Sequence, residues 1–456
     1  MKKMTFGVCC GLVTILCVFM MSIVIKMGTK NIVVEKLHVN NELTRFILQG
    51  VQTADVIDEA TGDMFVQIDW EALYPFEDST NIVQVVGDGK QIQSIGEIYT
   101  EKVTHIRNVV NDYATTYLMN RIGFVESAYR YDAVMGWKLT PSSATDGIVF
   151  LENGYLAQIH AKNDTTKIAE NMENLKKYLE EKNIDFLYVQ APTKMSMTEK
   201  YLPAGMQDYA NENADELIQK LQRAEISVLD LRPEMYKIAQ DYYGAFYITD
   251  HHWTTTTAFQ MAGVLAQYLN DEYGYAFDEK YYDITNYTVQ KYENAFLGSL
   301  GKKVTLAMAE PENFELIVPD FDTDFTIQIP ERKIDIRGTF EDTLLDYRHL
   351  QKIDYYYENC YAAYMNRNDA TAAIHNESLT SNQGKRILFI KDSYATPFIP
   401  YIALGVEYVD TLYEIRYTGS VKSYIDSIQP DLVVVMYSAD NVNGDGSKKT
   451  SAFYLQ

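Results

Sequence analysis

Cysteine is scarce in this sequence, and most of it lies at one end. Three of the four cysteines, Cys9, Cys10 and Cys17, fall within the first 26 residues, which leaves Cys360 alone in the rest of the chain. A lone cysteine forms no intrachain disulfide, and the sequence has no Cys-x-x-Cys pair of the kind found in zinc and redox sites. The main part of the chain is therefore predicted to lack both a disulfide framework and a cysteine-held metal.

Basic side chains are also in short supply. The 456 residues include 40 Lys and Arg against 63 Asp and Glu, which gives a formal net charge of −23. Binding to the phosphates of nucleic acid requires clusters of Lys and Arg, so the charge balance predicts no nucleic-acid partner. Tyrosine, by contrast, is abundant at 36 residues. Its amphipathic ring suits sugars as well as ordinary packing.

One long hydrophobic run stands near the N-terminus. Residues 5–25 carry no charge, and Lys2 and Lys3 precede them. About 20 apolar residues cross a bilayer as a helix, and basic residues ahead of such a run keep its start in the cytoplasm. No convincing small-x-small cleavage site follows. The sequence therefore predicts a retained transmembrane signal anchor over residues 1–26, and a single-pass cell-membrane protein whose main domain is extracytoplasmic.

The remainder is predicted to divide at about residue 140. Residues 27–140 show no chemical motif and are interpreted as a stem or accessory region. Residues 141–456 contain short apolar runs that alternate with amphipathic helical stretches, such as residues 184–190 after a helix at about 165–182. This alternation predicts an α/β domain with a parallel sheet covered by helices. The rhythm breaks at about 275–384, which we interpret as an insertion that covers or flanks the site.

Two stretches hold the residue types of nucleophilic catalysis. The segment DHHW at 250–253 enters a predicted helix, and Ser393 follows a predicted strand at 386–390. A serine hydroxyl is a weak nucleophile unless a base takes its proton and a third group orients that base. Residues two apart in an extended segment point the same way. Asp250 and His252 therefore fit the roles of orienter and base, and Ser393 fits that of nucleophile.

The predicted position of Ser393 suits this chemistry, because it lies at the carboxyl end of a strand and at the start of a helix. Open α/β sheets bind ligands at this edge, and N–H groups at a helix start stabilise developing negative charge. A glycine-bearing turn at 296–301 offers further N–H groups, so Gly298 and Ser299 are candidate oxyanion or substrate residues. The ordinary alternatives are a helix N-cap and a plain turn.

Four motifs, taken in order, make the chain resemble the bacterial DHHW proteins. They are DHHW at 250–253, FLGSLGKK at 296–303, IKDSYATPFIPYIA at 390–403 and IRY at 415–417. More distantly, residues 145–440 are similar to the alginate O-acetyltransferases of the SGNH hydrolase superfamily. The resemblance implies a flavodoxin-like, three-layer SGNH fold, permuted so that Asp-x-His precedes the nucleophile. It assigns Ser393 as nucleophile, His252 as base and Asp250 as orienter.

The resemblance also implies a function. A serine O-acetyltransferase or esterase would transfer an acyl group to a cell-surface polysaccharide, or remove one, without a cofactor. Because the acyl group must cross the membrane to reach such an enzyme, a membrane-bound O-acyltransferase is the implied source of the donor. Two departures from the family pattern stand out: Lys391 replaces the glycine usual before Asp-Ser, and no asparagine is securely placed as the oxyanion side chain.

Several alternatives remain open from the residues alone. His251 is an alternative base, but adjacent residues of an extended segment face opposite sides, so we predict a structural hydrogen-bonding role for it. Trp253 is expected in the core or the pocket wall, with substrate contact as the alternative. Asp250, His251 and His252 also form a ligand set that suits zinc or manganese in a metal-dependent hydrolase. A non-catalytic glycan-binding or assembly protein is the third possible function, since folds are shared across functions.

Overall fold

The computed structural model describes the chain over these ranges: residues 147–238, 241–351, 354–365, 368–379, 381–413, 415–443 and 453–455. It also describes strands β1 (Thr53–Ile57) and β2 (Met64–Ile68), which pair antiparallel, and the isolated residues Met21, Ile25, Glu126, Ser127 and Arg130. The chain divides into two compact units, residues 1–131 and 132–456. All the other strands and helices named below belong to the second unit.

Most of the predicted anchor and of the predicted stem at 27–140 lies outside the described residues. Of the anchor, only Met21 and Ile25 are described, both in helical conformation. Within the described residues, no helix has the length and apolar character that a membrane span requires. The membrane anchor and the role of the stem therefore stay predictions.

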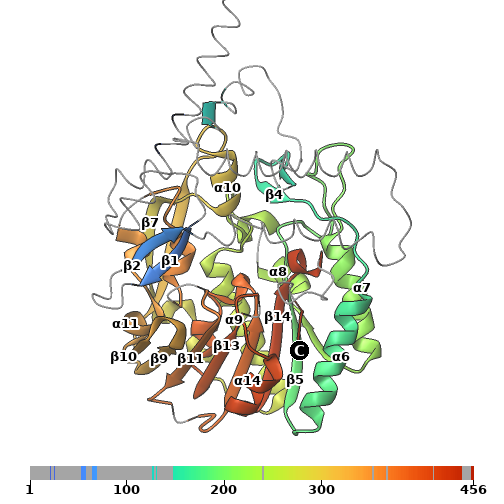
Figure 1. Ribbon diagram of the computed structural model, residues 1–456, viewed down its shortest axis with the longest axis vertical. Coiled ribbons are helices and arrows are strands. Elements are labelled where there is room, and N and C mark those ends of the chain that lie inside the picture. Colours follow the sequence, from blue (N-terminus) through green and yellow to red (C-terminus); the bar gives the residue numbers. More distant parts are fainter. Residues whose placement is uncertain are drawn as a thin grey trace, which may run out of the picture. The chain divides into compact units, whose positions relative to one another are not determined.

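An eight-stranded sheet forms the centre of the second unit, in the order β10-β9-β11-β13-β12-β14-β5-β6 (Figure 1). Its parallel strands are β5 (Asp185–Ala191), β6 (Ser227–Asp230), β12 (Arg386–Lys391), β13 (Tyr408–Leu412) and β14 (Leu432–Ser438). Apart from the edge strand β6, these are largely buried apolar runs, as expected where helices cover both faces of a sheet.

The connectivity of these strands is that of a permuted flavodoxin sheet. Flavodoxin-like sheets have the strand order 2-1-3-4-5. When β12 is counted first, β13-β12-β14-β5-β6 has that order, although β5 and β6 precede the other three in the chain. The change of direction falls between β12 and β14, where ligands bind in this class of sheet. Ser393 follows β12 directly, so the fold places it at this edge.

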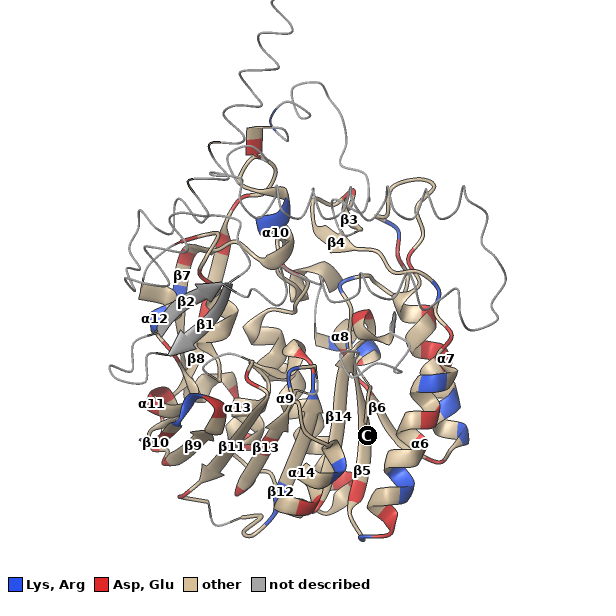
Figure 2. Cartoon of the chain, viewed as in Figure 1, with Lys and Arg blue, Asp and Glu red and all other residues tan. Residues whose placement is uncertain are grey.

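Helices cover both faces of the sheet and give three layers. One face carries α6 (Thr166–Glu180), α7 (Ala210–Arg223) and α14 (Val421–Ile428), and the other carries α8 (Arg232–Ile238), α9 (Thr255–Tyr273) and α13 (Ile399–Ile402). The first set packs with Leu388 and Val433, the second with Phe389 and Val434. Acidic and basic residues are interspersed along α6 and α7 (Figure 2). The predicted α/β architecture is confirmed.

The predicted insertion at 275–384 contributes to the sheet itself. Strands β9 (Phe325–Ile329), β10 (Ile334–Gly338) and β11 (Thr371–Asn376) extend it antiparallel beyond β13. Strands β7 (Tyr287–Phe296) and β8 (Glu312–Pro319) form a separate antiparallel hairpin, and β8 packs against α9. The insertion is therefore an integral part of the described fold and not only a cover.

Shorter elements complete the unit. They are the hairpin of β3 (Ile148–Phe150) and β4 (Leu156–Gln158), the helices α10 (Ser299–Val304), α11 (Phe340–Leu344) and α12 (Arg348–Gln351), and the 3-10 turns η3 (Tyr242–Ala245), η4 (Glu279–Tyr282), η5 (Ile284–Asn286), η6 (Pro330–Arg332), η7 (Cys360–Ala363), η8 (Ser393–Ala395) and η9 (Ala439–Asn443). Of these, α10, η7 and η8 contain residues of the candidate site or residues that contact it.

Candidate active site

The DHHW motif lies on a short loop between η3 and α9, here called the DHHW loop (residues 246–253). Phe246 and Trp253 form an antiparallel bridge, and the Tyr247 N–H donates to the His252 carbonyl at 3.2 Å. The next residue, Thr254, caps α9. Both limbs of the loop are thus fixed, and Asp250 lies at its tip.

Asp250, His252 and Ser393 contact one another in that order. His252 Nδ1 is 2.5 Å from Asp250 Oδ1, and His252 Nε2 is 2.7 Å from Ser393 Oγ. The second distance is that of a hydrogen bond between a general base and the hydroxyl that it deprotonates. A carboxylate that accepts from Nδ1–H leaves Nε2 bare to accept the hydroxyl proton. Asp250 and His252 are buried and Ser393 is half-buried, so the arrangement has the geometry that a serine nucleophile, its base and an orienter require.

Asp250 is held in its charged form. Burial by itself raises the pKa of this carboxyl, but the His251 and His252 imidazoles and hydrogen bonds from His252 and Ser299 hold the pKa of Asp250 well below its usual range. The His252 N–H donates to Oδ1 at 3.1 Å and the Ser299 N–H donates to Oδ2 at 2.5 Å. A carboxylate fixed by two backbone donors holds His252 in one tautomer and one orientation.

His251 takes part in the site without reaching the serine. Burial, reinforced by the adjacent His252, lowers the pKa of His251 to about 4, so its imidazole is neutral near pH 7. Its Nδ1 is 2.9 Å from Ser299 Oγ, and its carbonyl accepts from the Tyr394 hydroxyl at 2.5 Å. These contacts fit the predicted hydrogen-bonding role, while His252 is the imidazole that contacts Ser393.

The glycine-bearing turn at 296–301 holds the tip of the DHHW loop. The Gly298 N–H donates to Thr249 Oγ1 at 2.8 Å, as the Ser299 N–H does to Asp250. A Cβ at residue 298 would lie 2.3 Å from the Cβ of Asp250, so the turn approaches too closely for any side chain. The prediction that these N–H groups face an oxyanion is therefore wrong, because both are donated within the protein.

A half-buried carboxylate on β8, that of Glu312, fixes the start of the loop tip. Glu312 accepts from the N–H groups of Ile248 and Thr249, each at 2.7 Å, and from the Thr249 hydroxyl. Burial raises the pKa of Glu312. Nearby, burial lowers the pKa of Lys194 to about 8, and its ammonium donates to the Ile248 carbonyl at 3.2 Å. Thr249 is thus bonded to Glu312 on one side and to Gly298 on the other.

The nucleophile is held from a different direction. Asp392 is buried, caps η8 by accepting from the Tyr394 N–H at 2.9 Å, and accepts from the Ser438 N–H and the Asn441 amide, each at 2.7 Å. These bonds tie the end of β12 to the end of β14. The serine that follows is therefore placed by the parallel core of the sheet.

Lys391, which replaces the glycine usual before Asp-Ser, is buried beside this site. Its ammonium donates to Asn368 and lies 3.5 Å from Thr396 Oγ1. Burial lowers its pKa to about 8. The hydrogen-bond partners of Lys391 are thus side chains other than Ser393, so the departure from the family pattern leaves the contact between His252 and Ser393 intact.

Aromatic side chains enclose the His252 ring. Tyr361, in η7 of the insertion, stacks on it with ring centroids 4.0 Å apart and 17° between the planes. The Tyr361 hydroxyl is buried and has no hydrogen-bond partner in the part of the chain that the structure describes. Trp253 is fully buried, donates its indole N–H to the Tyr394 carbonyl at 3.0 Å and stacks on Phe398. Trp253 therefore belongs to the core, and the alternative of substrate contact is wrong.

Glu312 and Tyr361 were not singled out from the sequence. Glu312 lies 63 residues after the Thr249 that it holds, and it opens an ordinary strand. Tyr361 is one of 36 tyrosines and stands in no motif. No local signal marks either residue, because each acts through a contact that exists only after the insertion has packed against the DHHW loop.

Asp250, His251 and His252 also offer ligand atoms that lie within 4.8 Å of one another. Two of these atoms, Asp250 Oδ1 and His252 Nδ1, are only 2.5 Å apart. Ligands that share a zinc ion at about 2.0–2.1 Å in tetrahedral geometry stand about 3 Å or more from each other. The side-chain positions therefore fit a hydrogen-bonded triad better than a metal centre.

The sheet order is that of an SGNH hydrolase-like α/β fold, and comparison with known proteins agrees. Residues 143–344 match the family described as SGNH hydrolase-like domain, acetyltransferase AlgX. The predicted resemblance is confirmed over that span, which is less than half of the chain: residues 143–344 are similar to the SGNH hydrolase-like domain of AlgX. The match includes Asp250 and His252, whereas Ser393 lies beyond it. A search of curated proteins finds no match to the sequence.

Solved structures show the same fold. PatB1 of Bacillus cereus, solved with a sulfonyl adduct, is 20% identical, with 68% of this chain and 98% of that chain covered and a TM-score of 0.55. A DHHW family protein from Eubacterium siraeum is 15% identical, with 67% and 95% covered and a TM-score of 0.52. At these identities the likeness is one of fold, and it extends over nearly the whole length of both neighbours.

Proposed function

We propose that the protein is an extracytoplasmic, serine-dependent O-acyltransferase or esterase that acts on a cell-surface polysaccharide. The observation that carries the proposal is the continuous contact from Asp250 through His252 to Ser393, at 2.5 and 2.7 Å. The match to an acetyltransferase domain supports acyl chemistry. So does the sulfonyl adduct of PatB1, since sulfonyl electrophiles react with activated hydroxyl groups.

The geometry suits a two-step reaction through an acyl-enzyme. His252 Nε2 takes the hydroxyl proton as Ser393 Oγ attacks the carbonyl carbon of the donor, and Asp250 stabilises the imidazolium that forms. Collapse of the tetrahedral intermediate breaks the bond to the leaving oxygen, which receives the proton from His252. A sugar hydroxyl, or water, then gives its proton to His252 and attacks the acyl group, which frees Ser393.

Charge on the tetrahedral oxygen needs donors, and the Ser393 N–H is our candidate. The N-cap residue Asp392 accepts from the Tyr394 N–H, and no bond among the described residues takes up the N–H of Ser393. An N–H group at this position points to where an oxyanion forms in serine acyl transfer. The turn at 296–301 is not a source of donors, because its N–H groups hold Thr249 and Asp250.

The setting of the reaction follows from the sequence. The apolar run at 5–25, with Lys2 and Lys3 ahead of it, favours a membrane anchor with the catalytic unit outside. An enzyme on the extracytoplasmic side needs an acyl group that has crossed the membrane. A membrane-bound O-acyltransferase would supply it. The acceptor in this proposal is a polysaccharide of the cell surface.

Covalent labelling tests the proposal. Protein treated with an aryl sulfonyl fluoride should gain one adduct, mapped to Ser393 by mass spectrometry, and should hydrolyse 4-nitrophenyl acetate. Ser393→Ala should lose both properties, and His252→Ala should lose them nearly completely because the hydroxyl is no longer activated. Ser427→Ala, on the outer helix α14, is the matched control and should behave like the wild type.

Two other outcomes would point to the alternative functions. Stoichiometric bound metal, with activity lost to a chelator and no sulfonyl adduct, would favour the metal-dependent hydrolase. Folded protein without labelling or hydrolysis would favour the non-catalytic glycan-binding protein. Either result would overturn the serine mechanism.

A further inference from the structure

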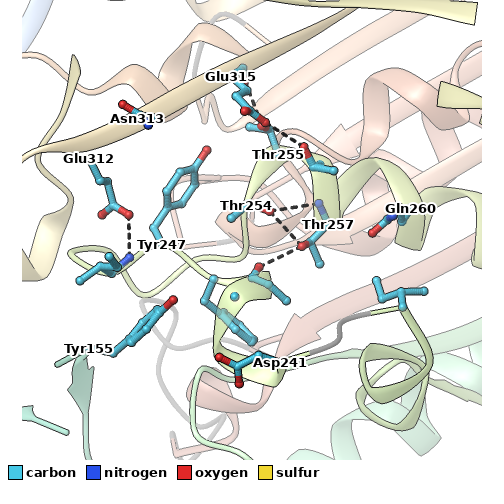
Figure 3. A pocket seen from close by; sticks show the side chains of 16 residues that line it. Tyr155, Asp241, Tyr247, Thr254, Thr255, Thr257, Gln260, Glu312, Asn313 and Glu315 are labelled. Carbon is cyan, nitrogen blue, oxygen red and sulfur yellow. Dashed lines mark hydrogen bonds between the residues drawn. The ribbon is translucent and has the colours of Figure 1, made fainter. Parts of the chain in front are cut away.

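A cavity of about 590 Å³ lies against the DHHW loop, on residues that the proposed mechanism does not use (Figure 3). Residues 244–248, which run from η3 into the DHHW loop, line one part of it, and residues 254–257, at the start of α9, line another. Strand β8 forms a further wall through Glu312, Asn313 and Glu315. Its volume lies in the range of about 300–1,000 Å³ that is typical of ligand sites.

The charge of the lining has one sign. Its carboxylates are Asp241, Glu312 and Glu315, and none of the sixteen lining residues is Lys, Arg or His. Glu312 already accepts from Ile248 and Thr249. Among the described residues, the Glu315 carboxylate accepts one bond, from the Thr256 hydroxyl to Oε2 at 3.0 Å, which leaves capacity on Oε1. An anionic ligand would therefore meet negative charge without a cation in the lining to pair with it.

The remaining lining combines uncharged polar side chains with apolar ones such as Ile238, Phe246 and Ile248. Figure 3 places Asn313 and Glu312 on one side of the opening and Gln260 on the other, and amide groups both donate and accept. Tyr155 adds an aromatic ring, and burial, with the negative charges of Asp241 and Glu312, raises the pKa of its hydroxyl and keeps it a donor. Carboxylates, amides and a tyrosine together suit a ligand rich in hydroxyl groups.

We infer that this cavity binds the acceptor glycan, and that this acceptor is neutral or amino-bearing and not a polyuronate. The inference rests on the proposed function and specifies its substrate class. The net charge of −23 acts in the same direction, because it repels polyanions before they dock. His252 and Ser393 do not line the cavity. Because the cavity is lined by the loop that also carries Asp250 and His252, we assign it to sugar units that flank the reacting one. Binding there would favour a sugar hydroxyl over water.

Acyl transfer to matched acceptors tests the inference. The full chain is given 4-nitrophenyl acetate with tetrasaccharides of glucose, of glucosamine or of mannuronate, and acetylated products are measured by mass spectrometry. We expect kcat/KM for the glucose or the glucosamine acceptor to exceed that for mannuronate by about tenfold or more, because like charge repels the uronate.

Substitutions in the lining should change this preference. Glu315→Gln removes a charge at nearly constant size. It should lower the ratio of kcat/KM for the glucose acceptor to kcat/KM for mannuronate about tenfold, and Glu315→Lys should lower this ratio further or reverse the preference. Glu170→Gln is the matched control, since Glu170 is exposed on α6 and pairs with Lys167. It should leave the ratio of the kcat/KM values unchanged.

The outcomes separate this inference from the proposed function. Release of nitrophenol without any acetylated sugar, or equal transfer to mannuronate, would overturn the inference and keep the serine chemistry. Without nitrophenol release the proposed function fails, and calorimetric titration of Ser393→Ala with the same sugars then tests the cavity alone. Binding of the glucose or glucosamine acceptor that weakens about tenfold in Glu315→Gln supports the inference, and equal binding of mannuronate, or no binding of any sugar, overturns it.

Discussion

The two ends of the candidate triad are held by different parts of the chain. Ser393 follows β12, and its neighbour Asp392 is bonded to the end of β14. Both strands belong to the parallel core. Asp250, in contrast, is held by Ser299 directly and by Gly298 and Glu312 through Thr249. All three of these residues come from the insertion.

This difference shows what the insertion adds. A parallel sheet fixes its strand ends through a large buried apolar surface, so the serine is placed as soon as the core forms. The orienter depends on a few hydrogen bonds, each worth about 1 kcal/mol net. The acid–base end should therefore be easier to displace without unfolding than the nucleophile end. Tyr361, which stacks on His252, also comes from the insertion.

The largest loss of kcat should come from removing a reacting group, and the loss should be the same whether the nucleophile or the base is removed. Ser393→Ala and His252→Ala should each lower kcat for ester hydrolysis by about 10⁴-fold or more. The double variant should fall little further, because hydroxyl and base act as one unit. Steady-state kinetics on folded protein measure this. Losses that multiply in the double variant would mean that the two residues act independently.

A single methyl group on the insertion should separate the two ends. Gly298→Ala places a Cβ 2.3 Å from the Cβ of Asp250, so the loop tip must move. A displacement of about 1 Å lowers kcat about a hundredfold, and the overpacking costs about 1–3 kcal/mol of stability. Kinetics and urea unfolding on the same preparations measure both effects.

The matched control is the same substitution on α9. In Gly263→Ala the new Cβ would lie 3.1 Å from the Cβ of Tyr282, remote from the triad. Stability should change, while kcat per folded molecule should stay within about twofold, because no contact of Asp250 is touched. If Gly298→Ala kept full activity, the turn at 296–301 would not be positioning the orienter.

The pH dependence of stability should report how strongly the insertion holds Asp250. Its pKa in the folded protein lies well below the ordinary value of 3.8, so the unfolded chain takes up the proton first. The stabilisation is present above about pH 4 and is lost as pH falls through the lower, folded pKa. Wild type should thus be more stable than Asp250→Asn near pH 7, and the gap should close in acid. Urea unfolding between pH 7 and 2 measures it.

Asp410 provides a control of opposite sign. Burial raises the pKa of this carboxyl, although Arg386 opposes the shift. The folded protein therefore binds the proton more readily than the unfolded chain, so this group contributes more stability as pH falls below the raised pKa. As pH falls, the free energy of unfolding of the wild type should increase relative to that of Asp410→Asn. If the stability difference from the wild type decreased in acid for both variants, the contacts of Asp250 would not be the cause of its pH dependence.

The parts that could be predicted from the sequence are those that local pattern encodes. Apolar spacing at 165–182 and 184–190 predicted α6 and β5 to within two residues, because helix and strand periods record which face is buried. The Asp-x-His spacing placed Asp250 and His252 on one side for the same local reason. The order of motifs supplied the permuted fold through its resemblance to a known family.

The parts that could not be predicted depend on tertiary approach. Alternation at 325–329 marks a strand, but nothing local states that β9 joins the central sheet through β11. The glycines of the turn at 296–301 suggested a ligand, whereas they are needed because the turn passes over Asp250. Glu312 and Tyr361 contact the DHHW loop from distant segments, so their spacing in the sequence carries no signal.

The smallest expected effect concerns the Tyr361 hydroxyl, and it tests whether the insertion positions His252 through a ring or through a hydrogen bond. This hydroxyl is buried without a partner in the described part of the chain, which costs about 1–3 kcal/mol. Tyr361→Phe keeps the stacked ring, so it should raise stability by about 1 kcal/mol and keep kcat within about threefold. Urea unfolding and ester hydrolysis measure the two quantities.

Two further variants make the result decisive. Tyr361→Leu removes the stack and admits water to the imidazole, so kcat should fall about tenfold. Tyr275→Phe removes another buried hydroxyl that has no hydrogen-bond partner among the described residues and lies remote from the triad. It should stabilise the fold and leave kcat unchanged. If Tyr361→Phe lost as much activity as Tyr361→Leu, the Tyr361 hydroxyl would be the group that the reaction needs. The insertion would then contribute a hydrogen-bond donor, and not only a ring that packs on His252.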